Sequence, residues 1–395
     1  MQSPPKPWKR AIFYAIARVE SSLRRREPYS QAELRQIRNF LVLQYDAPLG
    51  SVVHATPLYE ALKTTIPEAH VTVAASSMAA SVLQHNPFVD RCVVTPSPFQ
   101  TFWPALKSVR ELFCTMPPGP IYMVTPIGNQ RTRVAALTLF SRKGARVGYT
   151  LVPELYDLPL EFHPERGQIE GNLDILRALG HSIANYEPRI YFGQAEAKCA
   201  QELLAIPPAS CRPFIAYVTQ NSGGQRNQWP VGRFHQVIAD LSKLCGATPV
   251  FVGTKADGAA IESIRHGLPN QGISLAGKTT VPQLAAVLAQ CDLVVSLDTG
   301  TFHVARAVEL PGVVIAPAWQ SPLEWLPVNH PRYCVLRGPS IATTPDAYCM
   351  EEVSAQQVVD AALDMLNKFP STTSSRAARM DRSIAHAVAN QTNAS

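Results

Sequence analysis

The residue types best suited to hold a ligand lie together at Asp298, Thr299, Gly300 and His303, in the run DTGTFH. They follow an apolar run of strand length, 293–297, and precede a helix-like segment. At the carboxyl edge of a parallel sheet, such a turn lets backbone N–H groups bind an anion, while Asp298 accepts hydrogen bonds from hydroxyl groups. The alternative interpretation is a plain helix cap made by Asp298 and Thr299.

A second polar loop covers residues 219–230 (TQNSGGQRNQWP), between an apolar strand and a helix. Its glycines, its amides and Arg226 suit a diphosphate, and Trp229 with Pro230 would fix the entry to the helix. Because this loop also follows a strand, we expect it to face the same sheet edge as Asp298. An ordinary flexible loop is the alternative.

Three further candidates, Asp46, Ser51 and His54, follow the first predicted strand, 40–45. Any of them could take a proton from an incoming hydroxyl group, and each could equally cap a helix or lie on the surface.

Residues 272–279 (GISLAGKT) match the phosphate-loop pattern G-x-x-x-x-G-K-[ST]. The context is wrong, because the apolar strand ISLA lies inside the variable positions and no strand precedes the first glycine. Thr280 instead suits the N-cap of a helix that starts at Val281. We therefore predict no ATPase-type phosphate loop here.

Strand and helix patterns alternate along most of the chain, which predicts an α/β fold with two Rossmann-like, doubly wound domains facing a cleft. The predicted strands are 40–45, 71–75, 92–95, 121–124, 145–149, 214–218, 249–252, 273–275, 293–297 and 313–315. The predicted helices are 52–66, 101–114, 131–142, 167–179, 231–245, 257–265, 281–290 and 353–369. The predicted divisions are an N-terminal segment 1–36, domains 37–190 and 191–350, a C-terminal helix 351–369 and a disordered tail 370–395.

Residues 1–36 combine apolar positions at helical spacing (Trp8, Ile12, Ile16) with seven Lys and Arg residues between 6 and 26. This pattern predicts a basic amphipathic helix on an anionic membrane surface, and the alternative is a helix packed on the protein itself. Arg18 interrupts the apolar run, so the segment is too short to span a bilayer or to act as a secretory signal.

The composition excludes several classes. The 395 residues carry a net charge of +6 that is concentrated near the start, which argues against nucleic-acid binding. The eight cysteines show no C-x-x-C pair or other metal spacing and indicate a reducing compartment. The sequence lacks a G-x-S-x-G elbow, an H-E-x-x-H helix and a G-x-G-x-x-G after a strand, which disfavours hydrolases, zinc peptidases and dehydrogenases.

Four motifs in this order resemble glycosyltransferase family 9, the lipopolysaccharide heptosyltransferases and their relatives. They are L-G-x-V-V-x-x-T-P-L-x-x-A-L-K at 49–63, W-P-x-x-x-F at 229–234, L-A-G-K-T at 275–279 and D-T-G-x-x-H-x-A-x-A at 298–307. The resemblance implies a GT-B fold and sugar transfer with inversion, without a metal or other cofactor. It also implies a nucleotide-sugar donor such as ADP-heptose, a lipid-linked acceptor, and a cytoplasmic protein at the inner face of the cytoplasmic membrane.

Carried over by position, the resemblance implies that Asp298, Thr299, Gly300 and His303 hold the diphosphate and sugar of the donor. Further implied donor-binding residues are Thr219, Arg226, Asn227 and Asp257, the last at the nucleotide ribose. Fixed donors and the helix dipole would then take the place of a metal ion.

The chain departs from the family pattern at two positions. Ser51 stands where the family has the aspartate that acts as catalytic base, and we expect Asp46 to supply the carboxylate in preference to His54. Asn227 stands at the phosphate lysine, and neighbouring Arg226 restores the charge. These changes motivate a rival hypothesis, a catalytically impaired nucleotide-sugar binder that serves as a membrane-associated assembly partner.

Overall fold

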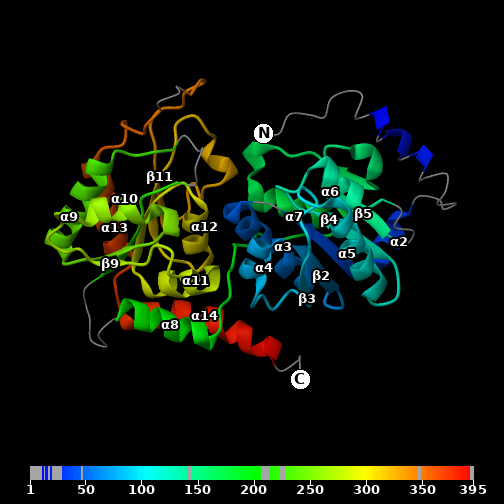
Figure 1. Ribbon diagram of the computed structural model, residues 1–395, viewed down its shortest axis with the longest axis horizontal. Coiled ribbons are helices and arrows are strands. Elements are labelled where there is room, and N and C mark those ends of the chain that lie inside the picture. Colours follow the sequence, from blue (N-terminus) through cyan, green and yellow to red (C-terminus); the bar gives the residue numbers. More distant parts are fainter. Residues whose placement is uncertain are drawn as a thin grey trace. The chain divides into compact units, whose positions relative to one another are not determined.

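The computed structural model describes residues 11, 12, 14–16, 18, 19, 29–45, 48–139, 144–205, 213–221, 227–344 and 348–391, without the side chains of 31 and 385–391. The chain divides into two compact units, Met1–Pro188 and Arg189–Ser395 (Figure 1). Each unit contains one six-stranded parallel sheet with helices on both faces.

The sheet of the first unit has the order β3-β2-β1-β4-β5-β6. Its strands are β1 (Asn39–Gln44), β2 (His70–Ala75), β3 (Arg91–Val94), β4 (Ile121–Thr125), β5 (Gly144–Tyr149) and β6 (Leu158–Leu160). The helices are α2 (Gln31–Gln36), α3 (Leu49–Thr65), α4 (Ser77–Leu83), α5 (Phe102–Thr115), α6 (Thr132–Leu137) and α7 (Gln168–Ala178).

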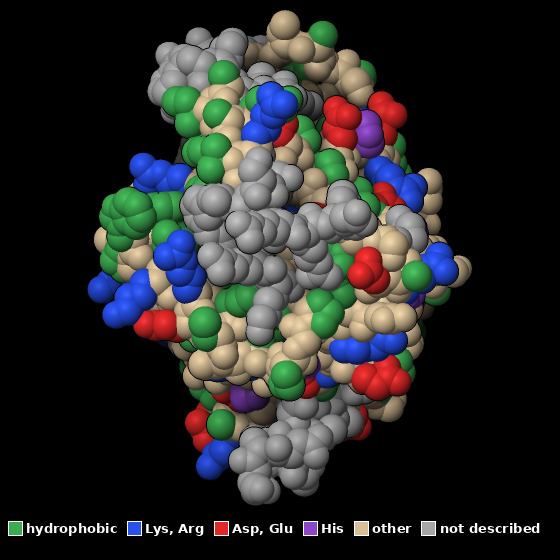
Figure 2. All heavy atoms as spheres, turned by 90° about the vertical axis from the view of Figure 1, so that its right-hand side faces the viewer, with side chains coloured by type: hydrophobic (Ala, Val, Ile, Leu, Met, Phe, Trp, Pro, Cys, Tyr) green, Lys and Arg blue, Asp and Glu red, His purple; other side chains and the backbone are tan. Residues whose placement is uncertain are grey.

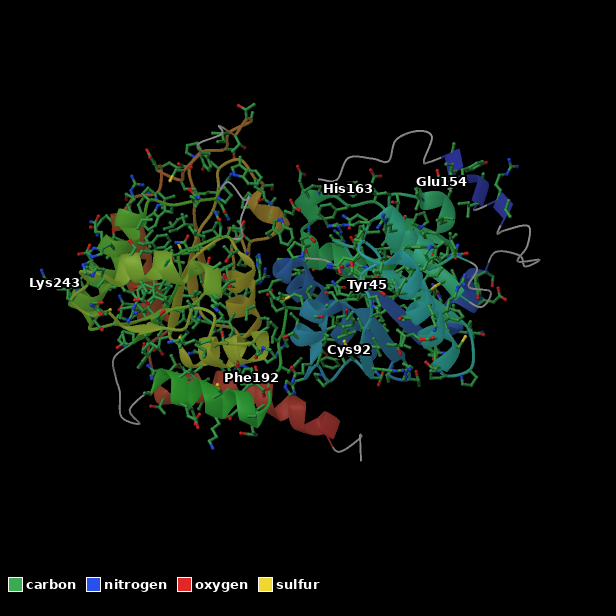
Figure 3. The ribbon with its side chains drawn as sticks, viewed as in Figure 1. Tyr45, Cys92, Glu154, His163, Phe192 and Lys243 are labelled. Carbon is green, nitrogen blue, oxygen red and sulfur yellow. The ribbon has the colours of Figure 1, made fainter. Side chains whose placement is uncertain are left out.

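One face of this sheet is covered by α5 and α6. Every second residue of β1 and its end points to this face, namely Leu41, Leu43 and Tyr45. These side chains pack in one core cluster with apolar residues of the two helices. Tyr45 lies within the first unit at the carboxyl end of β1, and Cys92 lies on the edge strand β3 (Figure 3). Burial raises the pKa of the Cys92 thiol to about 11, so this cysteine is an inert thiol near neutral pH.

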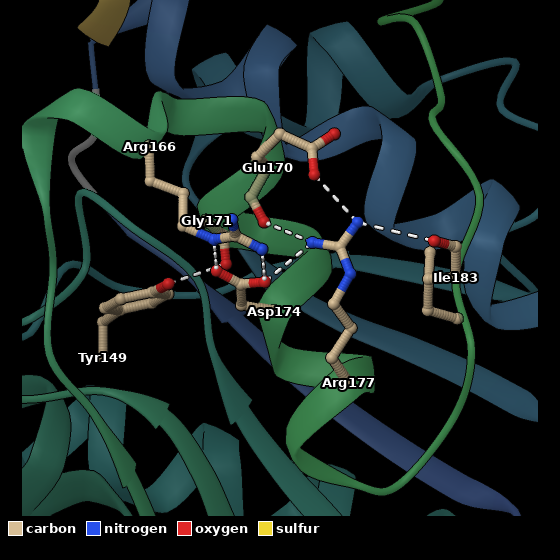
Figure 4. Close-up of polar contacts among 7 residues, drawn as sticks. All are labelled: Tyr149, Arg166, Glu170, Gly171, Asp174, Arg177 and Ile183. Carbon is tan, nitrogen blue, oxygen red and sulfur yellow. Dashed lines mark hydrogen bonds and ion pairs between the residues drawn. The ribbon is translucent and has the colours of Figure 1, made fainter.

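Helix α7 is fixed to the sheet by polar contacts (Figure 4). The Tyr149 hydroxyl, at the end of β5, donates to the Gly171 carbonyl at 2.7 Å. A Cβ on Gly171 would lie 2.4 Å from the end of the Ile127 side chain, so a larger residue here would require that side chain to shift. On the helix surface, the Asp174 carboxylate accepts hydrogen bonds from both Arg166 and Arg177.

The second sheet repeats the same topology, with the order β12-β11-β10-β7-β8-β9. Its strands are β7 (Phe214–Val218), β8 (Thr248–Phe251), β9 (Ile273–Ser274), β10 (Leu293–Leu297), β11 (Gly312–Ile315) and β12 (Tyr333–Leu336). The helices are α8 (Gln194–Leu204), α9 (Val231–Cys245), α10 (Gly258–Arg265), α11 (Val281–Gln290), α12 (Gly300–Ala307), α13 (Ala355–Lys368) and α14 (Thr373–Gln391).

In both units the strand order is that of the Rossmann fold, 3-2-1-4-5-6 in each unit's own numbering. The order reverses between the first and fourth strands, which are β1 and β4 in one unit and β7 and β10 in the other. Ligands of such sheets bind at this switch point, beyond the carboxyl ends of the strands. The predicted fold class of two Rossmann-like domains is therefore confirmed.

Several local features differ from the sequence predictions, and helices α2, α4 and α8 were not predicted. Helix α3 begins at Leu49 instead of Val52, so Ser51 lies in its first turn and not in a preceding loop. Helix α6 ends at Leu137, well before residue 142. The edge strands β6 and β12, of three and four residues, were not predicted.

The predicted disordered tail is wrong for most of its length, since 373–391 form helix α14. The buried Arg376 guanidinium donates to the Asp292 carboxylate, with Nε to Oδ1 at 2.9 Å. Arg379 donates to the carbonyls of Ala289 and Cys291. The polar composition of this segment predicts disorder, but its arginine side chains form hydrogen bonds with partners that lie about 90 residues away in the sequence.

The N-terminal segment is described only in part. Among 11–19 the described residues are helical, and Ile12, Tyr14 and Val19 are at least half exposed. No helix in the described part of the chain is long and apolar enough to cross a membrane. Positive and negative side chains are interspersed among those drawn in Figure 2.

Candidate functional site

The predicted ligand-holding turns meet at the switch point of the second unit. Ser296 of β10 pairs with Val218 of β7, so the residues that follow these strands are neighbours at the carboxyl edge. Thr219 follows β7, and Asp298 and Thr299 follow β10. The structure therefore brings together two loops that are separated by almost 80 residues in the sequence.

Two buried hydroxyl groups at this edge, Oγ1 of Thr219 and Oγ1 of Thr299, have no hydrogen-bond partner among the residues that the structure describes. Thr299 occupies the N-cap position of α12, yet its side chain makes no capping hydrogen bond. An unpaired buried hydroxyl costs free energy, so both groups need an acceptor that a ligand can supply. The helix cap is therefore an incomplete account of this turn.

The start of α12 adds positive potential beside these hydroxyls. Gly300 is the first residue of the helix, and the first N–H groups of any helix lack acceptors within it. Together with the helix dipole, these groups attract an anion. Two threonine hydroxyls and a helix N-terminus are chemically suited to phosphate oxygens.

His303 and Asp298 lie side by side at the same helix start, with His303 Nε2 at 3.7 Å from Asp298 Oδ1. Burial, with a smaller contribution from the Glu324 carboxylate, raises the pKa of Asp298 to about 7. Burial lowers the pKa of His303 to about 3, with a contribution from Arg306. Because the imidazole is neutral at pH 7, this contact is not an ion pair, and it offers hydroxyl groups a neutral nitrogen beside a carboxyl group.

Two residues of this edge were missed by the sequence analysis, Glu324 and Trp325. Glu324 ends a short 3-10 turn after β11, Pro322–Glu324, and Trp325 follows it directly. The Trp325 ring lies against His303, with ring centroids 5.8 Å apart at 36°. The local signal was an aromatic and acidic run, WQSPLEW at 319–325, shortly after a predicted strand.

The opposite side of the site is formed by the loop after β7. Asn227 is buried, and its Nδ2 donates to the Asp298 carbonyl at 2.7 Å. Its Oδ1 accepts from Asn221 Nδ2 at 2.7 Å, so this side chain ties the two loops together. Trp229 donates to the Val353 carbonyl and packs edge-on against Phe234, which fixes the entry to α9. Arg226 lies outside the described residues.

Asp257 follows β8, the neighbour of β7, at the same sheet edge. Its Oδ2 accepts from the backbone N–H and the hydroxyl of Thr254, at 2.6 and 2.8 Å. This capping box holds the carboxylate in place at the end of the second strand of a βαβ unit. In dinucleotide-binding sheets, an acidic residue at that position binds ribose hydroxyls.

Residues 272–279 match the phosphate-loop pattern but do not have the structure of a phosphate loop. Strand β9 (Ile273–Ser274) lies inside the variable positions, and α11 begins at Val281 instead of at the lysine. Thr280 is the N-cap of α11 and accepts from the Gln283 N–H, as predicted.

The proton-accepting candidates lie in the first unit. Asp46 is outside the described residues, whereas Ser51 and His54 are both buried in α3. The N–H of Tyr45, the residue before Asp46, donates to Oδ1 of the buried Asn129, which follows β4. Within the described part of the chain, no group of three or more His, Cys, Asp and Glu side chains could hold a metal ion.

Comparisons with known proteins agree with this architecture. Residues 129–346, more than half of the chain, match the model of "Glycosyltransferase family 9 (heptosyltransferase)". Lipooligosaccharide heptosyltransferase 2 of Haemophilus ducreyi is 25% identical over 309 residues, which cover 70% of this chain and 83% of that protein.

Two solved structures share the fold. A family 9 glycosyltransferase of Veillonella parvula has a TM-score of 0.72 and 20% identity, over 83% of this chain and 97% of that one. The ADP-heptose lipopolysaccharide heptosyltransferase II of Escherichia coli has a TM-score of 0.67 and 20% identity, over 83% of this chain and 98% of that one.

Proposed function

Because this chain belongs to glycosyltransferase family 9, we propose that it transfers a heptose or related sugar, with inversion and without a metal ion, to a lipid-linked glycan. The donor is a nucleoside diphosphate sugar. The acceptor is the lipopolysaccharide core or a similar glycan, by analogy with the lipooligosaccharide heptosyltransferase that the chain resembles.

The donor proposal is supported by the switch point of the second unit. The diphosphate accepts hydrogen bonds from Thr219, Thr299 and the N–H groups at Gly300, and Arg226 adds positive charge. The ribose binds Asp257, and the sugar hydroxyls bind Asp298 and His303. ADP-heptose is the first donor to test, because the heptosyltransferase II with the same fold is named for it.

The proposed transfer is a single displacement. Asp46 takes the proton of the acceptor hydroxyl, whose oxygen attacks the anomeric carbon and forms the new glycosidic bond. The bond between that carbon and the diphosphate oxygen breaks, and the nucleoside diphosphate leaves with the electron pair. The hydroxyls and N–H groups at the start of α12 stabilise its developing charge, a role that a metal ion fills elsewhere. Buried Ser51 lacks the basicity for proton abstraction.

The N-terminal segment is proposed to lie on the cytoplasmic membrane, where a lipid-linked acceptor is found. The described residues of this segment form a helix that exposes Ile12, Tyr14 and Val19. Exposed apolar side chains beside Lys and Arg residues are typical of interfacial helices.

The observation that carries the donor proposal is the pair of unpaired, buried threonine hydroxyls. Their removal should weaken donor binding without lowering the stability of the unliganded protein. The double variant Thr219→Val, Thr299→Val should bind ADP and ADP-heptose about tenfold more weakly in titration calorimetry, because two phosphate ligands are gone. The unliganded variant should melt no lower than the wild type, because it no longer buries two unpaired hydroxyls.

Thr72→Val is the matched control, because Thr72 Oγ1 is a buried, unpaired hydroxyl in the sheet of the first unit. It should leave both affinities unchanged. Equal affinities in the wild type and the double variant would refute the phosphate assignment. Donor binding without turnover on a lipopolysaccharide-core acceptor would favour the rival function, a nucleotide-sugar binder that does not catalyse transfer.

A further inference from the structure

The loop after β11, residues 316–326 (here the β11 loop), places an aromatic ring and a carboxylate beside the paired Asp298 and His303. Trp325 is half-buried and lies against the His303 imidazole, at 5.8 Å between ring centroids. Glu324 ends the 3-10 turn Pro322–Glu324 directly before Trp325, and its charge contributes to the raised pKa of Asp298. A flat apolar ring beside hydroxyl-binding groups is the composition of a site for a sugar, which has apolar C–H faces and a polar rim.

The β11 loop is held in place from several sides. The Arg337 guanidinium donates to the carbonyls of Ala318 and Gln320, at 2.8 and 3.2 Å. The Ala318 N–H donates to the Tyr348 hydroxyl at 3.0 Å, and the Leu326 N–H donates to the Pro322 carbonyl at 2.8 Å. A loop fixed in this way can present Trp325 without a large cost of ordering on binding.

The sheet topology indicates which part of the donor reaches this loop. Along the edge the order is β11, β10, β7, β8, and the unpaired threonines follow the two central strands. Asp257, at the ribose position of a βαβ unit, follows β8 on one side. If the diphosphate occupies the centre and the nucleoside lies over β8, the sugar must extend over β11.

We propose that Trp325 and Glu324 form the subsite for the transferred sugar, with the indole ring against one face of the sugar and the carboxylate accepting from its hydroxyl groups. This inference rests on the proposed function, since it assigns one end of the same donor. It makes the β11 loop the part of the second unit that distinguishes one sugar from another.

The test compares two ligands that differ only in the sugar, ADP and ADP-heptose, by titration calorimetry on the full chain. Trp325→Ala should raise the ratio of the ADP-heptose to the ADP dissociation constant about tenfold, with ADP affinity changed less than twofold. Trp325→Phe should restore most of this loss, because it keeps a ring. Glu324→Gln should raise the same ratio by a smaller factor.

Trp319→Ala and Leu323→Ala are the matched controls, because these residues of the same loop are 36% and 49% exposed. They should leave the ratio unchanged. If Trp325→Ala, Trp325→Phe and Glu324→Gln also leave it unchanged while the wild type binds both ligands, the sugar subsite is refuted and the proposed function stands. If the wild type binds neither ligand, both the proposed donor and the subsite fall.

Discussion

Asp298 and His303 are titratable groups whose burial favours their neutral forms. Asp298 has its pKa raised to about 7 from 3.8, and His303 has its pKa lowered to about 3 from 6.5. The raised carboxyl pKa means that the folded state loses stability as pH rises from about 4 to 7, because only the unfolded chain ionises freely over that range. The lowered imidazole pKa has the opposite effect, a loss of stability as pH falls below about 6.5.

The raised pKa of Asp298 predicts how the stability of the variant Asp298→Asn depends on pH. At pH 8 the variant should be more stable than the wild type by on the order of 2 kcal/mol, because it no longer buries an ionised carboxylate. At pH 5 the gain should be much smaller, since the wild-type carboxyl is protonated. Thermal melting without ligand at both pH values checks this.

Asp364→Asn is the control, because Asp364 is an exposed carboxylate in a surface pair with Lys368. It should show no pH-dependent gain. A gain for Asp298→Asn that is equal at pH 5 and pH 8 would contradict the raised pKa.

At the scale of elements, helix α14 is attached to the second unit by arginine side chains. Arg376, Arg379 and Arg382 are spaced three residues apart, and they bind Asp292, two main-chain carbonyls and Glu309. Asp292 also accepts from the Phe214 N–H at 2.8 Å, at the start of β7. The helix therefore braces the amino ends of β7 and β10, whose opposite ends form the site.

Arg376→Ala should destabilise the second unit by about 3 kcal/mol, because it leaves the buried Asp292 carboxylate without its cation. Arg382→Ala is the matched control, since the Arg382 side chain is 43% exposed and its pair with Glu309 should contribute less than about 1 kcal/mol. Urea unfolding, followed by a probe in the second unit, gives both values. Equal losses would show that the buried pair is not the anchor.

At the scale of the whole molecule, the two units repeat one topology but carry different chemistry. The switch point of the second unit has unpaired hydroxyls and a helix start, whereas that of the first has the predicted base Asp46 between β1 and α3. We therefore expect donor binding and proton abstraction to be separable by mutation.

Asp46→Asn should lower the rate of sugar transfer by about a hundredfold or more, because the amide cannot take the acceptor proton. The dissociation constant for ADP-heptose should change less than twofold, since the donor binds the second unit. Transfer assays and calorimetry on one preparation measure both.

Glu68→Gln, an exposed carboxylate of the first unit, is the control and should alter neither value. Near-normal transfer in Asp46→Asn would mean that another group is the base. Loss of donor binding in the same variant would mean that Asp46 contributes to the donor site instead.

The sequence by itself determined most of the elements and their order. Apolar runs of strand length predicted β7 and β10 to the residue. The DTG turn and the 219–230 loop were identified because residues typical of turns follow these strands. Such patterns are local, since the period of two or 3.6 residues is a property of the backbone. The same locality explains why α14 was not predicted, since its polar side chains find their partners in distant segments.

Only the tertiary structure decided which side chains meet. The order of strands and the register of β10 on β7 bring Asn227 to the Asp298 carbonyl, and the return of the chain through β11 brings Trp325 to His303. The shifted pKa values of Asp298 and His303 follow from burial by segments distant in sequence, and no local pattern encodes that burial. The sequence thus determined which groups stand at the sheet edge, and packing determined which of them remain unpaired for a ligand.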